Sequence, residues 1–235
     1  MRQVAGTSND LRYAAWLVQP AYLVIEVALA LFAGVRYSLA DDTISALGTS
    51  CSPHEGGCSA APLLMDLTFV LFGILQALGA LPLLRAHGRP AFVGWLWVVA
   101  GLGSVGVGLL PVDIHPLAHS LAALPVFVAQ PLALLLHARL SGPGRLRQAG
   151  LVLAGVAVAG DIAFAAMLGA DHWSGLAERA AIWPAKLWLP LALLSAAPTA
   201  GGATAAGRRR PADAPPPGPP PGDTGPASPP TAPRR

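Results

Sequence analysis

Residues 90–112, PAFVGWLWVVAGLGSVGVGLLPV, carry no charged side chain and are long enough for a helix to cross a bilayer. The hydrocarbon core is about 30 Å thick, and an α-helix needs about 20 residues to span it. Similar apolar stretches lie on both sides of this one. Because lipid offers no hydrogen-bond partners to the backbone, each stretch is expected to be helical. The expected helices cover about 13–35, 60–84, 90–111, 116–138, 148–169 and 180–197.

The composition supports an all-α fold class. Hydrophobic residues make up 54% of the chain and charged residues 11%, whereas a soluble domain has about 25% charged residues. We therefore expect a polytopic membrane protein with six transmembrane helices in one bundle over residues 13–197, after a short N-terminal segment, 1–12. Residues 198–235 are rich in Pro and poor in large apolar side chains, so we expect a disordered tail.

The charged residues are divided unevenly between the two sides of the expected bundle. Most of the 15 Lys and Arg residues lie before the first helix, after the sixth, or in the second and fourth loops. Since positive residues stay in the cytoplasm, both termini are expected to be cytoplasmic, in a multi-pass protein of the plasma (cell) membrane. The net charge of +3 then reflects orientation. No basic stripe interleaved with aromatics is present, so membrane lipids, and no nucleic acid, are the expected partners.

The two cysteines, Cys51 and Cys58, both fall in the expected first outer loop, residues 36–59. The exterior is the oxidising side, where disulfides persist. Pro53 and the glycines that follow it allow the chain to turn back between the two sulfurs. We expect a disulfide, with a zinc pair or two unreacted thiols as the alternatives.

The run from Asp113 to His119, DIHPLAH, is the most suggestive of chemistry. Pro116 suits the first turn of a helix, and His115 and His119 then lie one turn apart. Histidines at this spacing can share a metal ion, and Asp113 or Asp66 can add an oxygen ligand. In the simpler interpretation, Asp113 or His115 caps the helix and His119 hydrogen-bonds a neighbouring helix. We favour the latter, and so expect no cofactor; zinc belongs only to the metal interpretation.

Three charged residues interrupt the apolar stretches near mid-span: Glu26, Asp161 and Lys186. A charge in the bilayer is costly and usually faces protein or water. Lys186 is expected to pair with Asp161 or Glu26 inside the bundle. Such a pair would either fix the register of the helices or belong to a proton or ion relay, and the sequence leaves both open.

The first outer loop and the start of the last helix contain further polar residues. Asp42 or Thr43 is expected to begin a short helical turn. Ser45 beside these acids suggests a nucleophile, but the sequence itself places no base near it, so a capping role is favoured. Glu178 and Arg179 are expected to reach acids of the loop or lipid phosphates.

Gly101, Gly103 and Gly106 match the letters of a dinucleotide-binding fingerprint. That fingerprint works where a strand turns into a helix and presents free N–H groups to a pyrophosphate. Here the glycines lie inside an expected membrane helix, whose N–H groups are already bonded. We reject the cofactor interpretation and expect small residues such as Gly94, Gly101, Ser104 and Gly108 to allow close helix packing.

Three segments carry a family resemblance. Residues 37–48 read Tyr-x5-Thr-Ile-Ser-x-Leu-Gly; residues 103–119 join a glycine-rich helix to a proline–acid turn followed by His; and residues 175–188 contain Gly-x-x-Glu-Arg, then Pro and Trp. With this order of parts, the chain resembles the bacterial and archaeal membrane family known as domain of unknown function 998, over about residues 13–197. Because that family has no established activity, the resemblance implies the fold alone.

Two functions remain after these observations. The preferred one is a non-catalytic membrane protein with an outward-facing polar pocket, serving lipid or small-molecule binding, transport or envelope sensing. The alternative is an intramembrane metal-dependent hydrolase at the outer leaflet, whose zinc ligands come from Asp113, His115, His119 and Asp66 and whose nucleophile is a metal-bound water. The candidate pocket residues are Asp42, Ser45, His119, Glu178 and Arg179.

Overall fold

The structure is a computed structural model that describes residues 14–32, 37–49, 62–169 and 172–196. Within these ranges the chain forms helices and no strand, which confirms the all-α, polytopic fold. The elements are α2 (Ala21–Phe32), the 3-10 helix η1 (Ile44–Gly48), α3 (Pro62–Leu84), α4 (Arg89–Leu109), α5 (Pro116–Leu140), α6 (Arg145–Ala166) and α7 (Ser174–Ala196).

Five of the helical stretches are long and apolar enough to cross a membrane: Ala14–Phe32, α3, α4, α5 and α6. In the first stretch Pro20 interrupts the helix, and 3-10-type bonds carry the chain into α2. The sixth helix, α7, has 23 residues, as α3 does, but it is less apolar because it contains Glu178, Arg179 and Lys186. The sequence predicts a start at residue 180, whereas the helix begins at Ser174.

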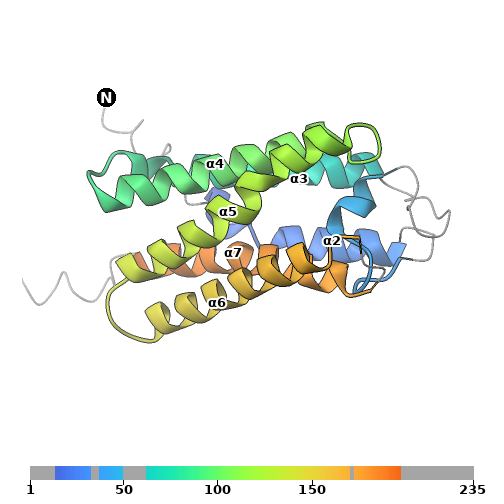
Figure 1. Cartoon of the computed structure of the whole chain (residues 1–235). Helices are drawn as coiled ribbons and strands as arrows, with labels where there is room; N and C mark the ends of the chain where they lie inside the picture. Colours follow the sequence, from blue (N-terminus) through green and yellow to red (C-terminus); the bar gives the residue numbers. More distant parts are fainter. Residues whose placement is uncertain (1–13, 33–36, 50–61, 170–171, 197–235) are drawn as a thin grey trace, which may run out of the picture. The chain divides into compact units, whose positions relative to one another are not determined.

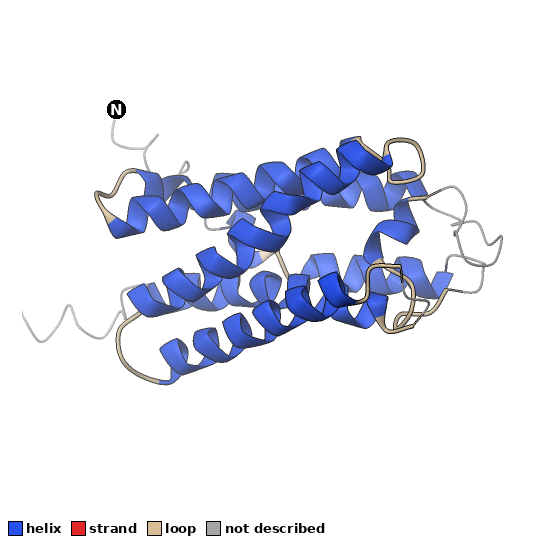
Figure 2. Ribbon diagram, in the orientation of Figure 1, coloured by secondary structure: helices blue, strands red, loops and turns tan. Residues whose placement is uncertain are grey.

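The helices pack mainly as neighbours in the sequence (Figures 1 and 2). The helix α4 packs against both α3 and α5, while α6 pairs with α7. The helix α5 also contacts α6 and α7, so it joins the two groups. The helix α2 contacts α3, α7 and η1. The short helix η1, which lies between α2 and α3 in the sequence, also contacts α3 and α7, so three helices of the bundle hold it.

Small residues bring α3 and α4 into close contact, as the sequence suggested. A Cβ added to Gly73 would lie 2.5 Å from the carbonyl oxygen of Gly101, and one added to Gly101 would lie 2.6 Å from the carbonyl oxygen of Gly73. Gly101, Gly103 and Gly106 all lie within α4. Their role in the described structure is therefore helix packing.

An aromatic cluster fills the end of the bundle where α4 begins and α5 ends. The ring of His137 lies between the indoles of Trp16, Trp97 and Trp188, and the indole N–H of Trp97 donates to His137 Nδ1 at 3.3 Å. Trp97 and Trp188 are fully buried. This end of the bundle is tightly packed, and the candidate polar residues lie at the other end.

Several expectations fall outside the described residues. Cys51 and Cys58 belong to this part of the chain, so no observation supports their disulfide and it stays a prediction. The N-terminal segment 1–12 and the tail 198–235 also lie outside it. The cytoplasmic location of both termini remains a prediction from charge.

Candidate functional site

The short helix η1 is fixed at its N-terminus by two side chains. The hydroxyl oxygen of Thr43 accepts a hydrogen bond from Ala46 N–H at 3.3 Å. The carboxylate of Glu178, which comes from α7, accepts from Ile44 N–H at 2.5 Å. The prediction that Thr43 begins a helical turn is confirmed. The capping role favoured for Ser45 is wrong, because Thr43 occupies the cap position.

Ser45 instead contacts an imidazole. Its Oγ lies 3.1 Å from Nε2 of His119, and Nδ1 of the same ring lies 2.8 Å from the carbonyl oxygen of Leu110. A carbonyl oxygen can only accept a hydrogen bond, so Nδ1 carries a proton. In the neutral ring Nε2 is therefore an acceptor for the Ser45 hydroxyl, which is also hydrogen-bonded to the carboxylate of Glu178.

The four candidate metal ligands are not assembled into a site. His119 has both ring nitrogens engaged, and it is buried, whereas His115 is exposed at the N-cap of α5 without a side-chain cap bond. Across the described ranges, no group of three or more His, Cys, Asp or Glu residues is arranged to hold a metal ion. The zinc interpretation, which needs Asp113 or Asp66 beside both histidines, gains no support from this geometry.

A cavity of about 460 Å³ opens beside Ser45 and His119. It is bounded by η1, α5, α6 and α7. The Oδ1 atom of Asp161, on α6, is buried and has no hydrogen-bond partner. The polar lining residues are Thr43, Ser45, Thr49, His119, Ser120, Asp161 and Glu178, and the larger apolar ones are Leu124, Phe127, Phe164 and Leu168.

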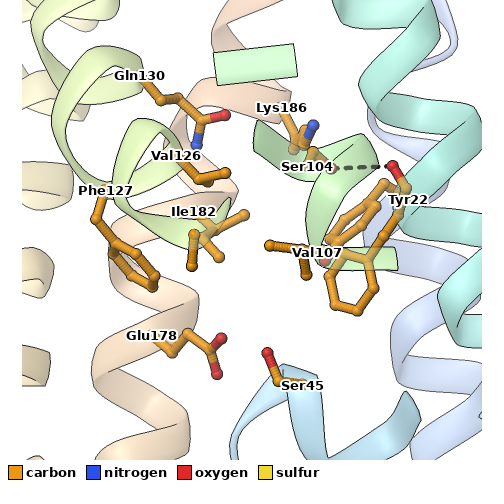
Figure 3. A pocket seen from close by; sticks show the side chains of 12 residues that line it. Tyr22, Ser45, Ser104, Val107, Val126, Phe127, Gln130, Glu178, Ile182 and Lys186 are labelled. Atoms are coloured by element: carbon orange, nitrogen blue, oxygen red, sulfur yellow. Dashed lines mark hydrogen bonds between the residues drawn. The ribbon is translucent and has the colours of Figure 1, made fainter. Parts of the chain in front are cut away.

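A second, smaller cavity of about 20 Å³ extends from this site into the bundle. Ser45 and Glu178 lie at one end of it, and Gln130 and Lys186 lie at the other (Figure 3). Gln130 Nε2 and the hydroxyl of Tyr22 are buried and have no hydrogen-bond partner. A polar space of this size has room for a water molecule. Gln130 and Tyr22 are not among the predicted site residues, because a neutral polar side chain within an apolar stretch gives a weaker signal in the sequence than a charged one.

Arg179, predicted as a pocket residue, instead ties elements together. Its Nη1 donates to the carbonyl oxygens of Leu39 (2.7 Å) and Asp42 (2.9 Å), and its Nη2 donates to the hydroxyl of Tyr37 at 2.7 Å. Its Nε lies 2.8 Å from a carboxylate oxygen of Glu26. Most of the guanidinium is thus engaged by the protein. Arg179 does not line the cavity beside Ser45, but it lines a separate, apolar cavity of about 500 Å³ with Leu39 and Trp183.

Asp42 is likewise structural. Its carboxylate accepts from Ser38 N–H at 2.7 Å, and its carbonyl oxygen accepts from Arg179. The neighbouring Tyr37 hydroxyl donates to the carbonyl oxygen of Thr43 at 2.7 Å. Burial raises the pKa of Tyr37 above its ordinary value, so this hydroxyl keeps its proton. These bonds shape the segment that leads into η1.

The predicted pairing of Lys186 with Asp161 or Glu26 is wrong. The Lys186 ammonium donates to the amide oxygen of Gln76 at 2.9 Å and lies 5.2 Å from the ring centre of Tyr22. Glu26 pairs with Arg179 and also accepts from the Trp183 indole at 2.8 Å. The three intramembrane charges therefore lie in three different environments.

One family model matches this chain. Its description is "Protein of unknown function (DUF998)", and it matches residues 17–195, which include nearly all of the helical residues described above. No curated protein and no solved structure matches the chain. The comparisons therefore identify the family of this chain but no ligand. The lining and the size of the cavity are the observations that bear on a ligand.

Proposed function

Because this chain belongs to the DUF998 family, whose function is unknown, we propose its function from its own geometry. The protein is an integral membrane protein that binds a lipid or a small amphipathic molecule in the cavity between η1, α5, α6 and α7. The observation that carries this proposal is the cavity of about 460 Å³, which falls within the range of about 300–1,000 Å³ that small-molecule sites occupy.

The lining of the cavity indicates an amphipathic ligand. Phe127 and Phe164 stack with their ring centres 5.0 Å apart and offer an apolar wall. The same lining also presents polar groups, namely Ser45, His119 and the unpaired carboxyl oxygen of Asp161. An acyl chain matches the first surface, and a head group rich in hydrogen-bond donors matches the second.

The two acidic residues that line the cavity also determine which charge the head group of a ligand can carry. Asp161 and Glu178 are both within its wall. The charge of Arg179, which does not line this cavity, is paired with Glu26, and its Nη atoms donate to the segment 37–42. An anionic head group would meet carboxyl groups without a compensating cation. We therefore assign the cavity a neutral or cationic head group, such as that of a monoacylglycerol.

The distribution of arginine supports an outer-leaflet location for the cavity. Arg85, Arg89, Arg139 and Arg145 lie at the ends of helices opposite the cavity. Positive residues mark the cytoplasmic side, so the cavity faces the exterior of the plasma membrane. Transport or envelope sensing would begin with binding at this same place.

Binding can be tested with a fluorescent nitrobenzoxadiazole-labelled monoacylglycerol, added to the purified full-length chain in detergent and followed by fluorescence anisotropy. Ala123 lines the cavity, and Ala123→Trp fills it, whereas Val128→Trp on the same helix adds equal bulk at an exposed position outside it. We expect saturable binding that Ala123→Trp abolishes and Val128→Trp retains. Absence of saturable binding to the parent chain, or equal binding to both variants, would refute the proposal.

A further inference from the structure

We propose that Ser45 is a nucleophile activated by His119, and that the protein transfers the acyl group of a neutral or cationic lipid ester first to Ser45 and then to water. This inference rests on the proposed cavity, because the ester must bind there with its carbonyl carbon against Ser45 Oγ. It adds a reaction to what is otherwise a binding function.

The first argument is the geometry of the pair. Ser45 Oγ and His119 Nε2 lie 3.1 Å apart, within the separation of about 2.6–3.2 Å found between serine nucleophiles and their bases. A third group orients the base, since the Leu110 carbonyl oxygen lies 2.8 Å from His119 Nδ1. This bond fixes the tautomer whose Nε2 can accept the Ser45 proton, which is the role that an acid plays in a catalytic triad.

The second argument is that the Ser45 hydroxyl takes no part in capping η1. It is hydrogen-bonded to two side chains that can exchange a proton, the imidazole of His119 and the carboxylate of Glu178. Thr43 and Glu178 already cap η1. Other hydroxyls near the site donate to carbonyl oxygens, as Ser120 does to Pro116 at 2.9 Å. Among the residues that the structure describes, Ser45 is the serine whose hydroxyl is hydrogen-bonded to an imidazole, and it also lines the cavity.

The third argument concerns the positions of the neighbouring groups. Figure 3 shows the carboxylate of Glu178 facing the hydroxyl of Ser45. Glu178 is hydrogen-bonded to that hydroxyl and accepts from Ile44 N–H, so it holds η1 in the position that places Ser45 beside the imidazole. Glu178 is thus a positioning residue. The Thr43 hydroxyl lines the same cavity and accepts from Ala46 N–H, so its own proton is a donor for the oxygen that becomes negative during attack.

The reaction proceeds in two balanced steps. Ser45 Oγ bonds to the carbonyl carbon while its proton passes to His119 Nε2, and the ester C–O bond then breaks as the leaving alcohol takes that proton. Water next attacks the acyl carbon, gives one proton to His119, and releases the carboxylic acid as Ser45 Oγ recovers its proton. Water is the only co-reactant, and no electron donor or acceptor is needed.

The test uses an alkyl fluorophosphonate, which reacts with activated serines, on the purified full-length protein in detergent. Mass spectrometry of the parent chain locates the adduct without relying on any variant. We expect it on Ser45 and not on Ser120, which lines the same cavity without contacting an imidazole. His119→Gln should lower the labelling rate by about 10²–10⁴-fold, the usual contribution of a general base. Ser141→Ala, at the opposite end of α5, should react with the fluorophosphonate at the same rate as the parent chain.

Two results would overturn the inference: no adduct on Ser45 of the parent chain, or an unchanged labelling rate in a folded His119→Gln variant. Binding of the fluorescent monoacylglycerol to Ser45→Ala separates this inference from the function on which it rests. If that variant binds while the parent forms no adduct, the nucleophile is refuted and the binding function stands. If the parent neither binds nor reacts, both are refuted.

Discussion

Arg179 of α7 and Glu26 of α2 form an ion pair of 2.8 Å in which both side chains are buried, with 3% and 0% of their surface exposed. The same guanidinium holds Tyr37, Leu39 and Asp42 through hydrogen bonds. One side chain therefore connects two membrane helices with the segment that leads into η1. The position of Ser45 depends on this connection, although Arg179 never touches Ser45.

The first prediction is that Arg179→Ala strongly destabilises the bundle. Removal of one partner leaves the carboxylate of Glu26 buried without its cation, which costs about 3–5 kcal/mol. Arg145→Ala, at the exposed start of α6, should change stability by less than about 0.5 kcal/mol. The free energy of unfolding in mixed detergent micelles measures both. Equal stability of the two variants would contradict the role given to Arg179.

The second prediction separates the ion pair from the rest of the Arg179 contacts. Glu26→Gln removes the charge that Arg179 compensates, and the double variant Glu26→Gln with Arg179→Met removes both charges. Because an unpaired buried charge costs more than a missing pair, the double variant should be more stable than the sum of the single effects predicts. A double-mutant cycle on unfolding free energies measures this coupling. Simple additivity would show that the two side chains act independently.

The third prediction concerns the close approach of α3 and α4. In Gly73→Ala the new methyl group would lie 2.5 Å from the carbonyl oxygen of Gly101 and 2.9 Å from Val105 N. The helices must separate, which we expect to cost about 1–3 kcal/mol.

The matched control for this change is Gly155→Ala in α6, where an added Cβ meets no atom within 4 Å. Alanine is a better helix former than glycine by about 1 kcal/mol, so this variant should be as stable as the parent or more stable. Thermal unfolding of both proteins in one detergent provides the comparison. A Gly73→Ala protein as stable as Gly155→Ala would show that the helices do not approach as described.

Length and hydropathy predict most of the helices, because the bilayer imposes one requirement on every span. The expected helices 90–111 and 116–138 correspond closely to α4 and α5. The start of α7 differs from the predicted one because the charged residues Glu178 and Arg179 come just before the apolar stretch, and hydropathy therefore places the helix start after them. In the structure both side chains are satisfied by partners in other elements, so the helix begins earlier, at Ser174.

The pairing within the site could not be read from the sequence. Ser45 and His119 are 74 residues apart, and Ile44 and Glu178 are 134 apart. Their contact depends on which faces of η1, α5 and α7 meet, and hydropathy does not encode that choice when helices are apolar on all sides. The same reason explains Lys186: charge alone suggested an acid as its partner, whereas the helix that faces it presents the amide of Gln76.

The fourth prediction concerns acid sensitivity at the junction of the segment 37–43 with α7. The Asp41 carboxylate accepts from the N–H of Trp173 at 3.0 Å and from the hydroxyl of Ser38 at 2.8 Å. These bonds, the Trp173 N–H first, lower the pKa of Asp41 below its ordinary value of 3.8. Its contribution to stability is therefore fully present above that value and is lost as pH falls through the lower pKa of the folded protein.

Comparison of the parent with Asp41→Ala tests this. The parent should have the higher melting temperature at pH 6, and the difference should shrink as the pH is lowered past 3.8, the ordinary value of the aspartate pKa. Melting temperatures over a pH series in one detergent measure the trend. A difference that stays constant down to the lowest pH would show that the hydrogen bonds of Asp41 do not depend on its ionisation.

The fifth prediction concerns orientation. Gly142 lies in the loop between α5 and α6, where an added side chain meets no atom within 4 Å, and His172 lies at the other end of α6 with 81% of its side chain exposed. Arginines flank the first position, so the positive-inside rule places it in the cytoplasm. In a background with Cys51→Ser and Cys58→Ser, we therefore expect an impermeant maleimide to label His172→Cys in intact cells. Gly142→Cys should react only after permeabilisation. The reverse pattern would place the cavity at the inner leaflet, where Ser45 would meet lipids from the cytoplasmic side.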